Sequence, residues 1–398
     1  MKGNKSRVVI NATFGHENPT GLGVYTHELV LELLTAECDY DFTVYSSFPA
    51  LKKMYPEKVI LVSSLTSPGL GFKGHLMRLL WQQTMLPFKS RRQNASLLYS
   101  TVPEGILFSP VKQIITMHDI LAVRYPEMNP RMKYHFYYTV PILLKNSQAV
   151  ICPSENTKQD VITYYAIKDK PIYVISEGFN RQRFYPREKG VVQKRYGLGN
   201  YLLYIGDMRP YKNLERSLEA FARLNMNDLS FVIGGKKDSR FYPDIEKKVD
   251  GLLLKDRVLF LDYVPEEDLP HLYSEAEAFV FPSLYEGFGL PPLEAMACGC
   301  PVVVSNAASL PEVCGDAVRY VDPYDVESIA QGIHEVLTDE MMRQNLRAKG
   351  LERAELFSWE RAAKEHLKIF EECLGREKTK KSDSKRQQFL NGDNASCE

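Results

Sequence analysis

The segment Ala278–Pro301, AFVFPSLYEGFGLPPLEAMACGCP, restricts the fold of this chain more than any other stretch. It begins with an apolar run, Ala278–Phe281, of the length expected for a parallel strand that is buried on both faces. A loop with two glycines follows. Pro291 and Pro292 then suit the first turn of a helix, where the N–H that proline lacks would have no partner. Residues Leu293–Cys298 are therefore predicted to form a short helix.

Two carboxylates accompany this helix N-terminus. Glu286 lies in the glycine loop and Glu294 in the first helical turn. The N–H groups at a helix N-terminus suit a phosphate, whereas a carboxylate suits two neighbouring ribose hydroxyls. The pattern favours a ligand that carries both hydroxyls and phosphates. For Glu294 taken alone, a favourable interaction with the helix dipole is an equally good explanation.

Strand patterns recur along the chain and alternate with helical patterns. Strands are predicted over residues 7–13, 41–47, 59–64, 96–101, 113–117, 148–153, 171–176, 201–205, 229–234, 258–261, 278–281, 301–305 and 319–321, and helices over 23–36, 131–146 and 351–370. Strands separated by helices indicate parallel sheets that are covered on both faces, which is the α/β class. The charged stretch 177–190 is interpreted as a linker, and the polar residues 376–398 as a disordered tail.

The composition argues against several classes of protein. Lys plus Arg and Asp plus Glu number 50 each, so no overall positive charge points to nucleic acid. No apolar run approaches the ~20 residues of a membrane-spanning helix, and the N-terminal segment is too short in its apolar part for a signal peptide. The seven cysteines include no CxxC pair, which argues against a disulfide framework or a zinc site. We therefore expect a cytoplasmic protein.

The run EGFGLPPLEAMACGCPVV, with seven residues between Glu286 and Glu294, resembles the signature of retaining glycosyltransferases of family 4. The resemblance covers the chain from about Arg7 to Cys373. It implies the GT-B fold, in which two Rossmann-like domains with parallel sheets face each other across a cleft. The expected domains are an N-terminal acceptor domain over 1–180, completed by a C-terminal helix at 358–374, and a C-terminal nucleotide-sugar-binding domain over 190–357.

The resemblance also implies roles for the central segment. The backbone amides of Phe288, Gly289 and Leu290 are expected to hold the diphosphate of a nucleotide sugar. Glu294 is expected to hold the ribose hydroxyls. Glu286 is expected to hold hydroxyls of the transferred sugar, close to the anomeric carbon.

A basic loop after strand 201–205 is a second part of the expected site. In this family an arginine and a lysine of this loop bind the diphosphate, which implies these roles for Arg209 and Lys212. Many members carry the arginine directly after Gly206, where this chain has Asp207. From the residues alone, exposed loop charges are the alternative explanation.

Four further positions take their roles from the resemblance. Gly21 and Gly23 match glycines that face the donor phosphates or the acceptor, although a simple glycine turn explains them equally well. Val264 lies in a turn where the family holds the nucleotide base through backbone groups. His118 matches a histidine that points at the transferred sugar from a strand end, and Asp119 would orient its ring or cap the next turn.

The resemblance implies a retaining, metal-independent transfer of a hexose, mannose or glucose, to the hydroxyl of a saccharide or lipid-linked acceptor. GDP-mannose or UDP-glucose is the expected donor, and no cofactor is required. Fixed positive groups make a metal unnecessary for the leaving diphosphate. Two alternatives remain open: a GT-B nucleotide-sugar epimerase, or a non-catalytic GT-B partner subunit.

The segment Phe72–Arg92 combines basic and apolar residues. A helix of this kind can lie on an anionic membrane surface, here the inner face of the membrane. The alternative is a helix that packs its apolar face on the sheet.

Overall fold

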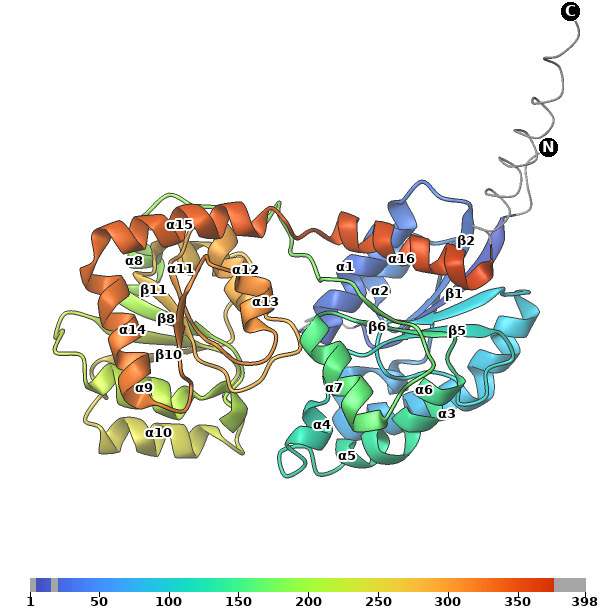
Figure 1. The fold of residues 1–398 in the computed structure, drawn as a ribbon, viewed down its shortest axis with the longest axis horizontal. Coiled ribbons are helices and arrows are strands. Elements are labelled where there is room, and N and C mark those ends of the chain that lie inside the picture. Colours follow the sequence, from blue (N-terminus) through green and yellow to red (C-terminus); the bar gives the residue numbers. More distant parts are fainter. Residues whose placement is uncertain (1–4, 16–20, 376–398) are drawn as a thin grey trace, which may run out of the picture.

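A computed structural model describes residues 5–15 and 21–375 and contains two α/β lobes (Figure 1). The predicted disordered tail, 376–398, lies outside the described residues. Each strand predicted from the sequence is present, and both sheets are parallel throughout their pairings. The predicted α/β class is therefore confirmed.

The first sheet has seven strands in the order β3-β2-β1-β4-β5-β6-β7. Its strands are β1 (Ser6–Ala12), β2 (Tyr40–Ser46), β3 (Val59–Leu61), β4 (Leu97–Ser100), β5 (Lys112–Thr116), β6 (Ala149–Cys152) and β7 (Ile172–Val174). The helices of this lobe are α1 (Leu22–Thr35), α2 (Pro49–Met54), α3 (Gly71–Arg92), α4 (Leu121–Arg124), α5 (Met132–Tyr134), α6 (Val140–Asn146) and α7 (Glu155–Tyr165).

Alternate residues of β1 divide the core of this lobe between the two faces of the sheet. Val8 and Ile10 pack with α1, whereas Val9 packs with Leu86 of α3. The predicted helix 131–146 contains a π-helical turn, His135–Thr139, between α5 and α6.

The second sheet has six strands in the order β10-β9-β8-β11-β12-β13. Its strands are β8 (Tyr201–Ile205), β9 (Ser230–Gly234), β10 (Val258–Asp262), β11 (Ala278–Phe281), β12 (Val302–Ser305) and β13 (Arg319–Val321). The helices are α8 (Val191–Tyr196), α9 (Leu214–Ala222), α10 (Tyr242–Gly251), α11 (Leu269–Glu275), α12 (Leu290–Ala297), α13 (Leu310–Cys314), α14 (Val326–Thr338) and α15 (Glu340–Ala354). The central strands β8 and β11 are buried along almost their whole length.

The single helix predicted over 351–370 is wrong, because the chain breaks there into α15 and α16 (Trp359–Leu374). Ser358 is extended and its hydroxyl accepts a hydrogen bond from the Arg361 N–H at 3.1 Å, so it begins a new helix as an N-cap. Figure 1 shows α16 lying over the first lobe, beside α1. Its residues Trp359 and Phe370 join the core that contains Val8 and Ile10.

Candidate functional site

The central glutamate of the sequence pattern is paired with the predicted lysine. Lys212 Nζ lies 2.8 and 3.0 Å from the two carboxylate oxygens of Glu286, and both side chains are nearly buried. Burial would lower the pKa of Lys212, but the Glu286 carboxylate outweighs it and raises that pKa. Burial raises the pKa of Glu286, and Lys212 opposes this shift. The pair places a charged lysine at the C-terminal edge of the second sheet.

Asn213 fixes the loop that carries Lys212. It is buried with φ 63°, a left-handed conformation that asparagine tolerates better than most residues. Its side-chain amide donates to the carbonyl oxygens of Pro282 (2.9 Å) and Pro323 (2.7 Å). The loop after β8 is thereby tied to the segment that follows β11 and carries Glu286.

The glycine loop enters α12 as the sequence predicts, but the helix begins at Leu290 rather than Leu293. Gly289 occupies the N-cap with φ 127°, a backbone conformation that favours glycine. The Ser309 hydroxyl lies 2.9 Å from the Glu286 carbonyl oxygen and 2.6 Å from that of Phe288, which holds the loop in place. The first N–H groups of α12 have no partner within the helix, so this end suits an anion.

Glu294 lies one turn into α12, and Pro270 and His271 of the neighbouring helix α11 line a cavity. The Tyr273 hydroxyl donates to Glu294 Oε2 at 3.3 Å, and burial raises the pKa of Glu294 to about 8. The cavity has a volume of about 580 Å³. It is lined by Asn180, Gln182, Arg183, Arg187, Glu266, Glu267, Pro270 and His271. Glu266 and Glu267 belong to the loop after β10, and Val264 is buried near the start of this loop. A Cβ at Gly234 would lie 2.9 Å from the Val264 side chain.

Arg209 does not join the Lys212 pair. Its Nε lies 3.5 Å from Asp207, the residue that departs from the family pattern, and its side chain is partly exposed. It lines a second cavity of about 170 Å³, beside the stacked rings of Tyr125 and Tyr211. Both cations lie in the loop after β8, but only Lys212 contacts a carboxylate of the family signature.

His118 is buried at the end of β5, and both of its ring nitrogens are occupied. Nε2 lies 2.8 Å from the Thr101 carbonyl oxygen, and Nδ1 lies 3.3 Å from Glu177 Oε1. Because a carbonyl oxygen only accepts, Nε2 carries a proton. Asp119 Oδ1 accepts from the Leu121 N–H at 2.8 Å, so Asp119 caps the following turn. Glu177, in the stretch predicted to be a linker, is therefore a buried partner of His118.

The glycines near the N-terminus lie at the start of α1. Gly21 is its N-cap with φ 44°, and a Cβ there would have open space, so its backbone conformation rather than close packing favours glycine. Gly23 is buried in the first turn. The roles of both glycines toward a ligand remain predictions.

The glycine loop also joins the two lobes. The Gly287 carbonyl oxygen accepts from the hydroxyls of Ser154 (2.7 Å) and Thr157 (3.0 Å) at the start of α7. A Cβ on Gly287 would lie 2.0 Å from the His118 carbonyl oxygen. The lobes therefore meet at the sequence signature itself.

A second contact between the lobes lies at the same end of α7. Both carboxylate oxygens of Glu312, on α13, accept from the Glu155 N–H, at 2.8 and 2.9 Å. The Tyr285 hydroxyl donates to Asp160 Oδ2 at 2.7 Å. No sequence signal identified Glu312, because it caps a helix of the other lobe.

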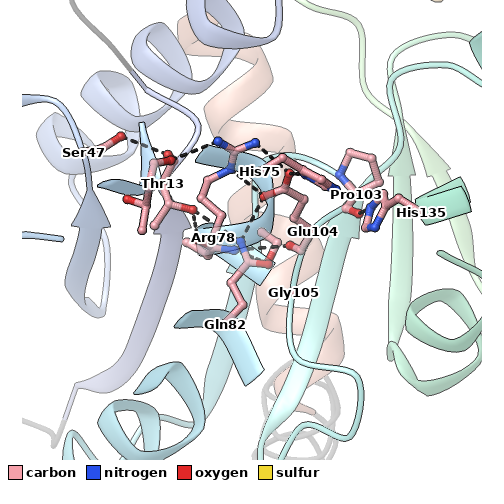
Figure 2. A network of polar contacts seen from close by, with 12 residues as sticks. Thr13, Ser47, His75, Arg78, Gln82, Pro103, Glu104, Gly105 and His135 are labelled. Carbon is pink, nitrogen blue, oxygen red and sulfur yellow. Dashed lines mark hydrogen bonds and ion pairs between the residues drawn. The ribbon is translucent and has the colours of Figure 1, made fainter. Parts of the chain in front are cut away.

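A buried polar network lies in the first lobe at the end of β4 (Figure 2). Glu104 accepts from Arg78 Nε (2.9 Å) and Nη2 (3.0 Å), and its Oε1 lies 2.9 Å from His75 Nδ1. Burial would raise the pKa of Glu104, but Arg78 and His75 outweigh it and hold that pKa well below its usual range. Gln82 Nε2 donates to Glu104 Oε2 at 3.1 Å, and His135 Nε2 donates to the Pro103 carbonyl oxygen at 2.8 Å. His75 and Arg78, counted in the sequence as part of a basic surface, thus point inward.

The remaining face of α3 is exposed and largely apolar. Its large exposed side chains are Phe72, Leu76, Leu80, Met85 and Phe88.

Among the described residues, no helix has the combined length and apolarity of a membrane span. Within the described ranges 5–15 and 21–375, no three or more His, Cys, Asp or Glu side chains are grouped so as to hold a metal ion.

Comparisons with known proteins agree with this geometry. The sequence model of glycosyl transferases group 1 matches residues 188–353, and that of glycosyltransferase family 4 matches residues 19–183. The chain is 30% identical over 376 residues to the O-antigen chain mannosyltransferase B of Escherichia coli, covering 88% of this chain and 96% of that protein. It is also 30% identical over 272 residues to the serotype-specific mannosyltransferase WbdA of Escherichia coli, but spans only 33% of that longer protein.

The solved structure of sucrose-phosphate synthase from Thermosynechococcus elongatus has the same fold. Its TM-score is 0.74 at 21% identity, and the match covers 93% of this chain and all of that one. The paired parallel sheets, the glycine loop with its two glutamates and the matches along both halves lead to one conclusion. The chain belongs to the family 4, group 1 glycosyltransferases and is a GT-B enzyme.

Proposed function

We propose that the protein transfers mannose from GDP-mannose, with retention of configuration, to a hydroxyl of a saccharide acceptor. The observation that carries the proposal is the buried Lys212–Glu286 pair beside the N-terminus of α12, one turn from Glu294. This set provides a cation and free amides for a diphosphate, and carboxylates for hydroxyls. The mannosyltransferase names of the relatives favour mannose over glucose from UDP-glucose, the second candidate donor.

In the proposed reaction the bond between the anomeric carbon and the diphosphate oxygen breaks as the acceptor oxygen bonds to that carbon. Negative charge develops on the diphosphate, where Lys212 and the amides of Phe288, Gly289 and Leu290 stabilise it. Preorganised stabilisation of this kind is usually the largest catalytic contribution, and losing one donor costs roughly 100-fold or more. Arg209 adds a partly exposed positive charge from the same loop.

The proposal assigns Glu286 to binding sugar hydroxyls rather than to covalent catalysis. Both of its oxygens are engaged by Lys212, which reduces its strength as a nucleophile. The acceptor therefore attacks on the face from which the diphosphate departs, and the acceptor proton moves to a diphosphate oxygen. His118, held by Thr101 and Glu177, shapes the wall beside the transferred sugar.

We propose that the transfer needs no divalent metal, because fixed protein charges face the leaving group. Assaying a panel of nucleotide sugars in the presence of EDTA tests the identity of the donor and the metal independence of the transfer in one experiment. Transfer from GDP-mannose should persist in EDTA, and loss of transfer that Mg²⁺ restores would contradict metal independence. Glu286→Gln and Lys212→Ala should each lower transfer at least 100-fold. If both variants keep near-normal transfer, the site assignment fails.

An epimerase would convert the nucleotide sugar without an acceptor, so incubation with donor alone separates the two reactions. A partner subunit without turnover would show no transfer with any donor. The names of the relatives and the intact pair of Lys212 and Glu286 favour a transferase.

We further propose that α3 contacts the inner face of the membrane, where a lipid-linked acceptor would reside. Residues 58–103 contain no Asp or Glu and, apart from the buried Arg78, five Lys or Arg, and the exposed apolar side chains of α3 lie within this stretch. Such a surface suits an anionic bilayer. Leu76→Glu combined with Leu80→Glu should abolish co-sedimentation with anionic vesicles at low salt. Met341→Glu, at an exposed position on α15, is the control. No co-sedimentation of the unchanged protein would refute the contact.

A further inference from the structure

We propose that Glu266 recognises the guanine base of the donor nucleotide and so selects guanosine over uridine nucleotides. The proposal rests on the nucleotide-sugar function proposed above and names the group that reads its base. It is carried by the position of Glu266 in the lining of the 580 Å³ cavity, which also includes residues of α11, the helix whose Tyr273 contacts Glu294.

The cavity is placed where the base of a bound nucleotide would lie. Helix α11 connects the two regions: Pro270 and His271 line the cavity, and Tyr273 of the same helix donates to Glu294. The charges of Arg183 and Glu266 act on the Glu294 carboxyl, so both lie within electrostatic range of it. A ribose held by Glu294 would therefore direct its base into this cavity. The volume is within the range of small-molecule sites.

Arg183 holds the Glu266 carboxylate in place and leaves most of its hydrogen-bond acceptor positions available. Arg183 Nη1 lies 2.6 Å from Glu266 Oε2. An ionised carboxylate has about four lone-pair positions, so one bond from arginine leaves both oxygens able to accept others. An ionised carboxylate only accepts hydrogen bonds. The cavity thus presents an oriented pair of acceptor oxygens.

Among the common bases, guanine matches two acceptor oxygens. Its Watson–Crick edge carries two adjacent donors, N1–H and the exocyclic N2 amine. Uracil presents one N3–H between two carbonyl oxygens, which a carboxylate repels. Adenine presents an acceptor nitrogen next to a single amine. A bidentate contact of this kind discriminates between bases by about 5- to 150-fold.

The test is calorimetric binding of GDP, inosine diphosphate and UDP to the full chain. Inosine diphosphate lacks only the exocyclic amine of GDP. The unchanged protein should bind GDP about 10-fold more tightly than inosine diphosphate and 10- to 100-fold more tightly than UDP. Glu266→Gln should reduce GDP affinity to the level of inosine diphosphate and should strengthen UDP binding, because the repulsion between the carboxylate and the uracil carbonyl oxygens is removed. Glu327→Gln, at an exposed carboxylate on α14 outside this cavity, is the control and should change none of these affinities.

The outcomes separate this inference from the function on which it rests. Equal binding of GDP and inosine diphosphate, or an unchanged ratio in Glu266→Gln, overturns the role of Glu266. Tighter binding of UDP than GDP overturns guanine selection while nucleotide-sugar transfer stands. Absence of binding by all three nucleotides overturns the proposed function together with the inference.

Discussion

The buried Lys212–Glu286 pair makes a quantitative prediction about stability. At 2.8 Å and an effective dielectric constant of about 20, the attraction is roughly 6 kcal/mol, most of which offsets desolvation of the two groups. Removing one partner leaves the other buried and unpaired, so Lys212→Met or Glu286→Gln should each destabilise the second lobe by about 3 kcal/mol. For a lobe of this size the corresponding fall in Tm is roughly 10 °C.

The double variant Lys212→Met/Glu286→Gln distinguishes pairing from general packing. Because it removes both charges, it should be less destabilised than the sum of the single variants, by about 2 kcal/mol or more. The exposed pair Arg223–Glu327, 2.6 Å apart in the same lobe, is the matched control, and its coupling should stay below about 1 kcal/mol.

Urea unfolding followed by far-UV circular dichroism is the suitable assay. Trp81 and Trp359, the two tryptophans of the chain, lie on α3 and α16 beside the first sheet, so their fluorescence reports mainly on that lobe. Additive effects in the double variant would refute the claim that Lys212 and Glu286 stabilise each other in the free enzyme.

Three further predictions concern the contacts around this pair. Gly287→Ala would place a Cβ 2.0 Å from the His118 carbonyl oxygen and should therefore reduce transfer at least 10-fold. Nucleotide binding, measured by calorimetry, should stay within a factor of about two. Normal transfer would contradict the contact between the lobes. Glu312→Gln should weaken the cap on α7 and lower Tm by a few degrees, with Glu327→Gln, at an exposed position, as the control. Because the pKa of Glu294 is raised to about 8, the folded state binds one more proton than the unfolded state between the ordinary carboxyl pKa and about 8, and stability should fall as pH rises through this window. In thermal melts over a pH series, Glu294→Gln should lack the part of this fall that Glu294 causes. An identical pH profile in the variant and the unchanged protein would refute the prediction.

Several outcomes follow from reasoning over short stretches of sequence. Strand positions were predictable because apolar runs bounded by turn residues are local patterns, and all of them appear in the two sheets. The Glu286 and Glu294 positions followed from a signature within a single strand, loop and helix. The start of α12 was less accurate, because two prolines suit any of the first helical positions and the N-cap conformation of Gly289 was not visible in the sequence.

Other features required contacts between distant parts of the chain. Helix α3 is an example. Its basic residues suggested one exposed surface, but Arg78 points inward because it pairs with Glu104, 26 positions later, in the loop after β4. The helical pattern over 351–370 joined the end of α15 to the start of α16, whereas the family resemblance placed a separate helix at 358–374. In the structure Ser358 caps α16, which packs against α1.

By itself, the sequence determined the α/β class, the strand positions and the two signature glutamates, because each is encoded by neighbouring residues that share one element or one loop. The tertiary structure alone decided that Lys212 reaches Glu286 across 74 positions, that Glu312 caps a helix of the other lobe, and that Glu177 holds His118. These contacts form because the sheets bring together the ends of parallel strands that are far apart in the sequence. The number of residues between two strands does not indicate how close their ends lie in space.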